Sequence, residues 1–128
     1  MKIFEGKNSS WSDKVNFVDK NDIFVGYDTG QDCCEDAGWF IADKITPYSY
    51  SDDEEQKITP DVECYDFDAD FFEAVESSDL DSGGMVAFKL VASGRPDLYL
   101  HLFNAHNGYY GHGFEVKHGG ETVKDDYL

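Results

Sequence analysis

The chain has 128 residues, 41% of them hydrophobic, which fits one folded domain and excludes global disorder. Its formal net charge of −17 at pH 7 excludes direct binding to nucleic acid or to an anionic membrane, because like charges repel. No apolar run approaches the roughly 18 residues that a transmembrane helix requires. The first residues, Met1–Lys7, lack the apolar stretch of a secretory signal, so we expect a cytoplasmic protein.

The three cysteines agree with a reducing compartment. Cys33 and Cys34 are adjacent, and neighbouring cysteines do not usually form an unstrained disulfide with each other. Pairing one of them with Cys64 leaves an odd thiol, which favours reduced side chains. Zinc sites usually use cysteines with about two to four intervening residues, so we expect the adjacent pair to serve packing or a turn.

The negative charge is concentrated in one segment. Residues 52–81 contain thirteen acidic residues and one lysine, which gives the segment a net charge of −12. Residues 1–51 and 82–128 have net charges of −4 and −1. A field of this kind attracts basic partners or cations.

The first half of the chain predicts a β-hairpin and a third strand. Apolar residues alternate in 15–18 and again in 23–27, and the turn residues Asp19–Asp22 separate the two runs. The short apolar run 38–42 predicts another strand. Residues 46–60 are rich in proline, serine and acidic residues, and we expect them to form a flexible acidic loop.

The middle of the chain predicts one more strand and the only helix. An alternating pattern favours a strand over 62–67. Phe71, Phe72 and Val75 then recur at three- and four-residue spacing, which predicts a short helix over 68–77.

The last third of the chain predicts an antiparallel meander of three strands. Residues 85–92 are almost continuously apolar, as expected of a central strand buried on both faces. Two alternating segments follow, 98–103 and 109–117, and the Asn-Gly pair within 106–108 is a strong hairpin signal between them. Residues 119–128 are expected to be a tail. Together the elements predict a single, mainly antiparallel β domain, a sandwich or strongly bent sheet, with one or two short helices.

Two motifs of the chain resemble a known family. The stretch from Leu98 to Glu115, which contains YLHLFNAHNGYYGHGF, and the earlier Asp32–Glu35 (DCCE) are similar to motifs of a family of small uncharacterised bacterial and phage proteins. The matching motifs cover about a fifth of the chain. The resemblance implies the cytoplasm of a bacterium or of a phage-infected host. It brings no established activity, so no catalytic residues are transferred.

Closely spaced carboxylates make the acidic segment a candidate partner-binding site. On an extended strand, every second side chain lies on the same face, about 6.6 Å from the last. Such a row could imitate the phosphates of DNA and occupy the basic groove of a nuclease, repressor or CRISPR-type effector. The simpler alternative is a solvated face that keeps the protein soluble. The candidate residues are Asp52, Asp53, Glu54, Glu55, Asp61, Glu63, Asp66, Asp68 and Asp70.

The same segment does not encode an EF-hand. Asp66, Asp68 and Asp70 copy the start of the calcium loop. Phe71 then stands where the loop needs glycine, and Ser77 where it needs glutamate. A looser oxygen-rich Ca²⁺ site stays open, although we expect no cofactor.

Histidines near the C-terminus form an alternative candidate site. His106 and His112 flank the Asn-Gly turn and could face each other across a hairpin at metal-binding distance. With neighbouring polar side chains, they could bind a ligand or support acid–base chemistry. Alternatively, these side chains hold an irregular hairpin together by hydrogen bonds. The residues of this alternative ligand site are Asn104, His106, Asn107, Tyr110 and His112.

The sequence therefore leaves two functions open. The first is a non-enzymatic acidic interaction protein, a phage-type inhibitor or DNA mimic that engages a basic nucleic-acid-binding protein or a defence-system effector. The second is a small ligand- or metal-binding domain or enzyme centred on the hairpin of His106 and His112. The chain contains no H-E-x-x-H motif and no dinucleotide-binding fingerprint.

Overall fold

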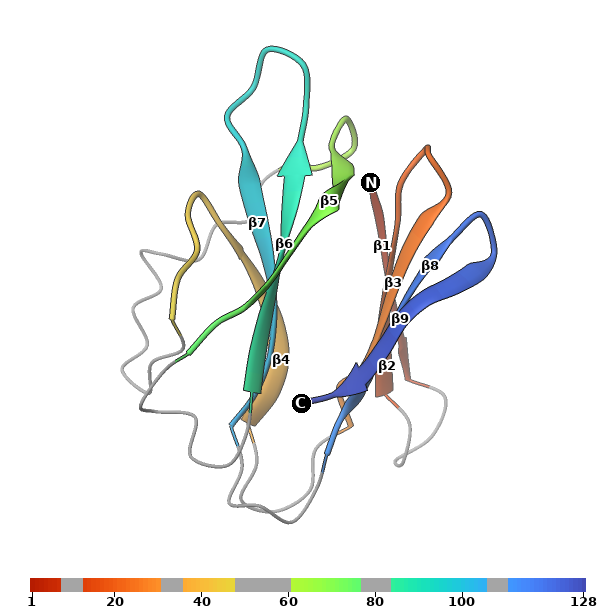
Figure 1. Cartoon of the computed structure of the whole chain (residues 1–128), viewed down its shortest axis with the longest axis vertical. Helices are drawn as coiled ribbons and strands as arrows, with labels where there is room; N and C mark the ends of the chain where they lie inside the picture. Colours follow the sequence, from red (N-terminus) through yellow and green to blue (C-terminus); the bar gives the residue numbers. More distant parts are fainter. Residues whose placement is uncertain (8–12, 31–35, 48–60, 77–83, 106–110) are drawn as a thin grey trace.

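The protein is a two-sheet β-sandwich. The computed structural model describes residues 1–7, 13–30, 36–47, 61–76, 84–105 and 111–128. All regular structure in these residues is β-strand, arranged as two antiparallel sheets that face each other (Figure 1). The predicted fold class, a mainly antiparallel β domain, is confirmed. The described ranges contain no helix that could span a membrane.

The first sheet has five strands in the order β1-β2-β3-β8-β9. The strands are β1 (Lys2–Lys7), β2 (Asp13–Val18), β3 (Ile23–Asp28), β8 (Gly113–His118) and β9 (Glu121–Tyr127). β2 and β3 form the hairpin that the alternation of apolar residues predicts. β1 has no counterpart among the predicted elements.

The second sheet has four strands in the order β4-β7-β6-β5. The strands are β4 (Asp36–Ala42), β5 (Asp66–Ala74), β6 (Gly84–Val91) and β7 (Leu98–Ala105). β6 and β7 are the central strands of this sheet, and most of their residues are buried. β6 is therefore buried on both faces, as its near-continuous apolar run predicts.

The C-terminal strands are antiparallel, as predicted, but they are divided between the two sheets. β6 pairs with β7 in the second sheet, whereas β8 pairs with β3 and β9 in the first. β7 already has β4 and β6 on its two sides, so β8 cannot pair with it. β7 ends at Ala105 in the second sheet and β8 begins at Gly113 in the first, so β7 and β8 do not form the hairpin expected around the Asn-Gly pair.

The predicted C-terminal tail is instead the edge strand β9. It pairs with β8 through a tight turn at Gly119 and Gly120, whose φ angles are +61° and +84°. Glycine takes such angles at low cost because it has no Cβ. All seven residues of β9 are exposed. Its sequence therefore does not alternate between apolar and polar residues, which is the pattern that predicts a half-buried strand.

The prediction of a helix over 68–77 is wrong, because its residues up to Ala74 extend β5. The predicted strand over 62–67 is also displaced. Residues 62–65 form a turn, closed by a hydrogen bond from the Tyr65 N–H to the carbonyl oxygen of Val62 (3.0 Å), and β5 begins only at Asp66.

A bulge in β5 determines how its three phenylalanines pack. The pairing of β5 with β6 shifts register between Phe67 and Phe72, so both rings contact Phe88 between the sheets, with centroid distances of 6.1 and 5.4 Å. Phe71 instead packs against Tyr99 on the other face of the sheet, at 5.7 Å. The adjacent residues Phe71 and Phe72 are therefore both packed. Neighbouring side chains of a regular strand point to opposite faces, so at a sheet edge with one exposed face usually only one of the two is packed.

The main core lies between the two sheets. Its buried members come from every strand except β1 and β9, and they include Val15, Phe17, Val25, Tyr27, Leu90, Leu100 and Leu102. A smaller cluster covers the outer face of the second sheet and includes Phe40, Met85, Ala87 and Phe103. The second sheet is therefore buried on both faces, and the first sheet has a solvent-exposed outer face.

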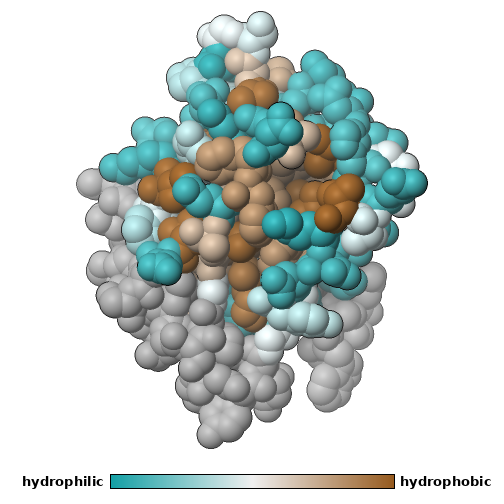
Figure 2. All heavy atoms as spheres, viewed as in Figure 1, coloured by the Kyte–Doolittle hydropathy of each residue, from teal (hydrophilic) through white to brown (hydrophobic). Residues whose placement is uncertain are grey.

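The sandwich is open along one side, between the edge strands β5 and β9. Figure 2 shows hydrophobic residues along the middle of this side, with hydrophilic residues around them. Phe72 on β5 is 37% exposed and Val123 on β9 is 61% exposed. Apolar side chains thus reach solvent where the two sheets are not joined by a strand.

Asp19 ties the two sheets together near the start of β5. Its buried carboxylate accepts hydrogen bonds from the N–H groups of Asn21 (3.0 Å) and Ile23 (2.9 Å) within the β2–β3 turn. Its other oxygen accepts one from the N–H of Phe67 on β5 (2.9 Å). Lys20 and Asp66 form an ion pair of 3.1 Å between the same two segments. One carboxylate therefore satisfies three backbone donors and joins both sheets.

We predict that Asp19→Asn lowers the free energy of unfolding by about 2–4 kcal/mol, because an amide has one acceptor oxygen and leaves a buried N–H without a partner. Urea denaturation measures this change. Asp22→Asn, the same substitution at an exposed position of the same turn, should change it by less than about 0.5 kcal/mol. Equal effects of the two substitutions would contradict the assignment.

Candidate functional site

The structure describes five of the nine carboxylates predicted to bind a partner. They lie in the turn before β5 and on β5 itself: Asp61, Glu63, Asp66, Asp68 and Asp70. The other four, residues 52–55, lie outside the described ranges. β5 is an edge strand, so one side of it has no neighbouring strand.

The aspartates of β5 do not form the regular row expected of an extended strand. The register shift between Phe67 and Phe72 falls at Asp68 and Asp70 and interrupts the alternation. The N–H of Asp70 donates to the Asp68 carboxylate (3.0 Å), a local hydrogen bond typical of a turn. The spacing of about 6.6 Å for a regular strand is therefore not kept along this segment.

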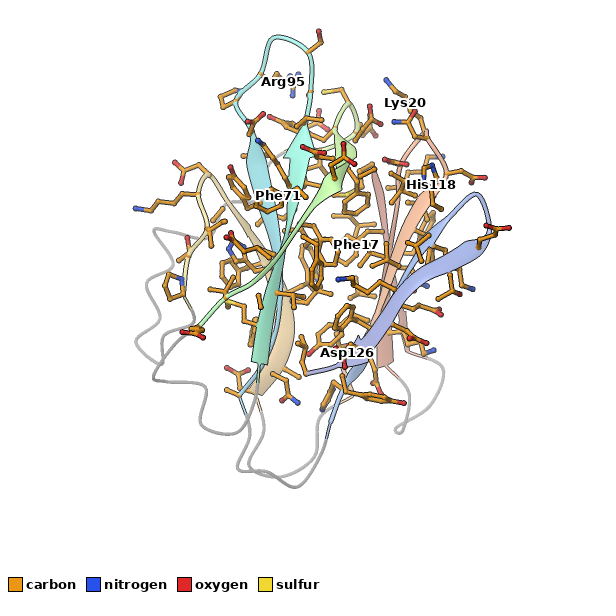
Figure 3. All side chains as sticks on the ribbon, in the orientation of Figure 1. Phe17, Lys20, Phe71, Arg95, His118 and Asp126 are labelled. Atoms are coloured by element: carbon orange, nitrogen blue, oxygen red, sulfur yellow. The ribbon has the colours of Figure 1, made fainter. Side chains whose placement is uncertain are left out.

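Several carboxylates of this segment form no ion pair with a described side chain. Asp61, Glu63 and Asp70 are exposed, and none of them forms an ion pair with a described Lys, Arg or His. Asp66 differs, since its carboxylate contacts Lys20, which Figure 3 shows at the β2–β3 turn. These exposed carboxylates give the edge of β5 a negative field that attracts basic groups. Together with Glu73, another exposed residue of β5, they define the acidic edge discussed below.

The described members of the alternative ligand site have structural roles. His112 is buried, and its Nδ1 lies 2.8 Å from the carbonyl oxygen of Asp28. The backbone N–H of His112 (2.9 Å) and the side-chain amide of Asn104 (3.0 Å) both donate to the carbonyl oxygen of Leu128. These bonds join β7 of one sheet to the end of β9 in the other. The remaining members, His106, Asn107 and Tyr110, lie outside the described residues.

His101 is a packing residue of the second sheet. Its ring is fully buried and stacks on Phe40 at a centroid distance of 4.3 Å. Its Nε2 accepts a hydrogen bond from the Thr46 N–H (2.9 Å), which leaves Nδ1 to donate to the carbonyl oxygen of Tyr99 (3.1 Å). Burial lowers the pKa of His101 to about 4. The ring is therefore neutral at pH 7 and holds residues 43–47 on the sheet.

The described part of the chain offers no evident metal centre. No three His, Cys, Asp or Glu side chains converge within it. Cys64 is a free, exposed thiol, whereas Cys33 and Cys34 lie outside the described residues.

A hollow on the outer face of the first sheet is missing from the predicted sites. It has a volume of about 410 Å³, and Gly26 and Gly113 contribute to its lining. Asp28, Glu115 and Asp125 also line it, so this face is acidic as well. Three of its lining residues, Asp125, Asp126 and Tyr127, belong to β9, which sequence analysis treats as a tail. The Gly119–Gly120 pair is the signal that could have predicted this hairpin.

A scan of the chain against protein-family models found no match, and comparisons with curated proteins and with solved structures found none either. The resemblance to small bacterial and phage proteins therefore stays a prediction. Function has to be inferred from the chemistry of the described surfaces.

We predict that His101 makes the protein less stable as the pH falls. Because its pKa is about 4 in the folded protein and about 6.5 when unfolded, its neutral form contributes fully above pH 6.5, and this contribution is lost between pH 6.5 and about 4. The loss amounts to about 3 kcal/mol.

The measurement is urea denaturation across this pH range for the native protein and for His101→Gln. The native protein should lose about 3 kcal/mol more than the variant, since glutamine does not titrate. His118→Gln, at an exposed position, should show the native pH dependence. Parallel curves for the native protein and His101→Gln would show that the buried ring does not control acid stability.

Proposed function

We propose that this protein is a non-enzymatic interaction protein whose acidic edge occupies the basic nucleic-acid-binding surface of a partner protein. In this role it is a phage-type inhibitor or DNA mimic. The observation that carries the proposal is the set of exposed carboxylates on and before β5 that form no ion pair with a described side chain, Asp61, Glu63 and Asp70.

Such binding would follow the electrostatics of DNA recognition, with the carboxylates of this protein in place of the DNA phosphates. A DNA-binding surface carries Lys and Arg side chains that contact phosphates. Carboxylates can accept the same charge-assisted hydrogen bonds, and Arg binds a carboxylate through two parallel N–H groups. The net charge of −17 also steers a basic partner towards the protein before contact. The interaction is therefore expected to weaken steeply with salt.

The attachment of β5 supports this proposal. The strand pairs with β6 on both sides of the bulge that contains Asp70, and the Asp19 carboxylate binds the N–H of Phe67 at its beginning. Carboxylates on a fixed strand lose less conformational entropy on binding than carboxylates on an unstructured segment. Because the bulge makes their spacing irregular, mimicry would depend on charge density more than on the periodicity of phosphates.

The alternative, a ligand or catalytic site at the histidines, has less support. His112 and Asn104 are both buried and use side-chain nitrogens to hold the fold together. The acidic edge, in contrast, is exposed. By its charge, the partner we propose is a basic nucleic-acid-binding protein or defence-system effector in a bacterial or phage-infected cytoplasm.

We predict that a tagged form of the protein captures a basic nucleic-acid-binding protein from bacterial lysate, and that salt and added double-stranded DNA both release it. DNA should compete because it needs the same surface of the partner. Mass spectrometry identifies the captured protein, and binding is then measured with the purified partner. A capture that DNA does not reduce would contradict mimicry.

We further predict that Glu63→Gln, Asp70→Asn and Glu73→Gln together weaken this binding by at least about tenfold, because three carboxylate contacts are lost. These side chains are exposed, so the fold should be unaffected. A matched control removes the same charge elsewhere, at exposed carboxylates, with Asp22→Asn, Asp43→Asn and Glu121→Gln. Equal weakening by both triple variants would show that only net charge matters, which would contradict a defined acidic edge.

A further inference from the structure

The open side of the sandwich contains a cavity distinct from the acidic edge. It has a volume of about 250 Å³ and lies between β5 and the strands β3, β8 and β9. Its walls are mainly aromatic and β-branched side chains from both sheets, including Ile23, Phe67, Phe72, Phe88, Val116 and Val123. Figure 2 shows that apolar residues are exposed along this side of the molecule.

Two irregularities keep the cavity from closing. In β5, the register shift between Phe67 and Phe72 separates part of the strand from regular pairing with β6. In β9, a second shift opposite Val116 and Lys117 leaves Val123 outside the ladder. A sandwich normally fills the space between its sheets with side chains, to the density of an organic crystal. The cavity is therefore a property of these two edges.

The lining of this apolar cavity includes the positively charged side chain of Lys124. Lys124 lies opposite Val116 in the β8–β9 ladder and lines the cavity. Its Nζ is 3.6 Å from the centroid of the Phe72 ring, and it forms no ion pair with another described residue. Asp68 also lines the cavity. Its carboxylate accepts the Asp70 N–H, but a hydrogen bond from a backbone N–H does not remove its negative charge. An ammonium group on an aromatic face can be drawn away by an anion, because a charge-assisted hydrogen bond is stronger in most settings.

We propose that this cavity binds a small amphiphile with a short apolar chain and an anionic head group. The chain lies between the sheets against Phe72 and Phe88, and the head group accepts hydrogen bonds from Nζ of Lys124. Burial of the chain removes apolar surface of both ligand and protein from water. The volume is at the small end for ligand sites, which limits the chain length.

The charge at the cavity decides which head group fits. A cationic head would meet Lys124 at close range, and a neutral head gains only from the apolar chain. The net charge of −17 repels anions at long range, but salt screens this repulsion beyond about 10 Å at 0.1 M. The contact with Lys124 lies well inside that distance, so an anionic head placed on its Nζ is favoured, whereas a cationic head would have to pair with Asp68.

The test is an NMR titration with three eight-carbon probes that differ only in the head group: octanoate, octanol and octylamine, at 0.15 M salt. We expect octanoate to bind tightest, at least about tenfold tighter than octylamine. The amide signals that move should be those of Phe72, Val116 and Lys124. No saturable shift with any probe would overturn the proposed cavity site.

Lys124→Met tests the head group, because it removes the charge and keeps an apolar side chain. Octanoate should then bind about as weakly as octanol does, while octanol binding stays unchanged. Lys117→Met is the matched control, since the Lys117 ammonium also lies over a ring, that of Phe24, at 5.7 Å, but outside the cavity. Unchanged octanoate binding in Lys124→Met, or equal binding of octanoate and octylamine to the native protein, would overturn the role of Lys124.

A second variant covers the case in which Lys124→Met does not fold. Val123→Asp changes an exposed residue of the cavity lining and adds a carboxylate there. It should weaken octanoate binding several-fold and leave octylamine binding equal or stronger. The acidic edge plays no part in this result, so the triple variant Glu63→Gln, Asp70→Asn and Glu73→Gln should still bind octanoate.

Discussion

The buried carboxylate of Asp19 is the interaction on which the arrangement of the two sheets depends most visibly. It binds two N–H groups of the β2–β3 turn and one of β5, and so it connects the first sheet to the edge of the second. The bond to Phe67 falls directly before the bulge. Without it, the start of β5 would have one fewer link to the first sheet. Both the acidic edge and the inter-sheet cavity include residues of this strand.

β5 therefore gives two different surfaces to the molecule. Its exposed carboxylates face solvent, whereas Phe67 and Phe72 turn towards the space between the sheets. The bulge makes this division possible, because it places two phenylalanines five positions apart on the same face. A strand with strict alternation would place them on opposite faces. The same irregularity thus weakens the periodicity of the carboxylates and opens the cavity.

Sequence patterns predicted the parts of the fold in which burial alternates or is continuous. The hairpin of β2 and β3 and the central strands β6 and β7 are of this kind. The helix prediction failed because the three- and four-residue spacing of Phe71, Phe72 and Val75 also suits a helix, and tertiary packing decided for a bulged strand. The acidic edge was predictable from charge density alone. The cavity was not, since Phe72 and Lys124 are far apart in sequence, lie in different sheets and meet only because the two sheets pack against each other.

The irregular edges of this sandwich have a consequence for association between copies of the protein. An unpaired strand edge invites another strand to add to it, and natural proteins prevent this with bulges and charged side chains. β5 has both, and β9 has a bulge together with Lys124, Asp125 and Asp126. Edge-to-edge polymerisation through these strands is thereby disfavoured. For the same reason, a partner at β5 is expected to contact side chains instead of extending the sheet.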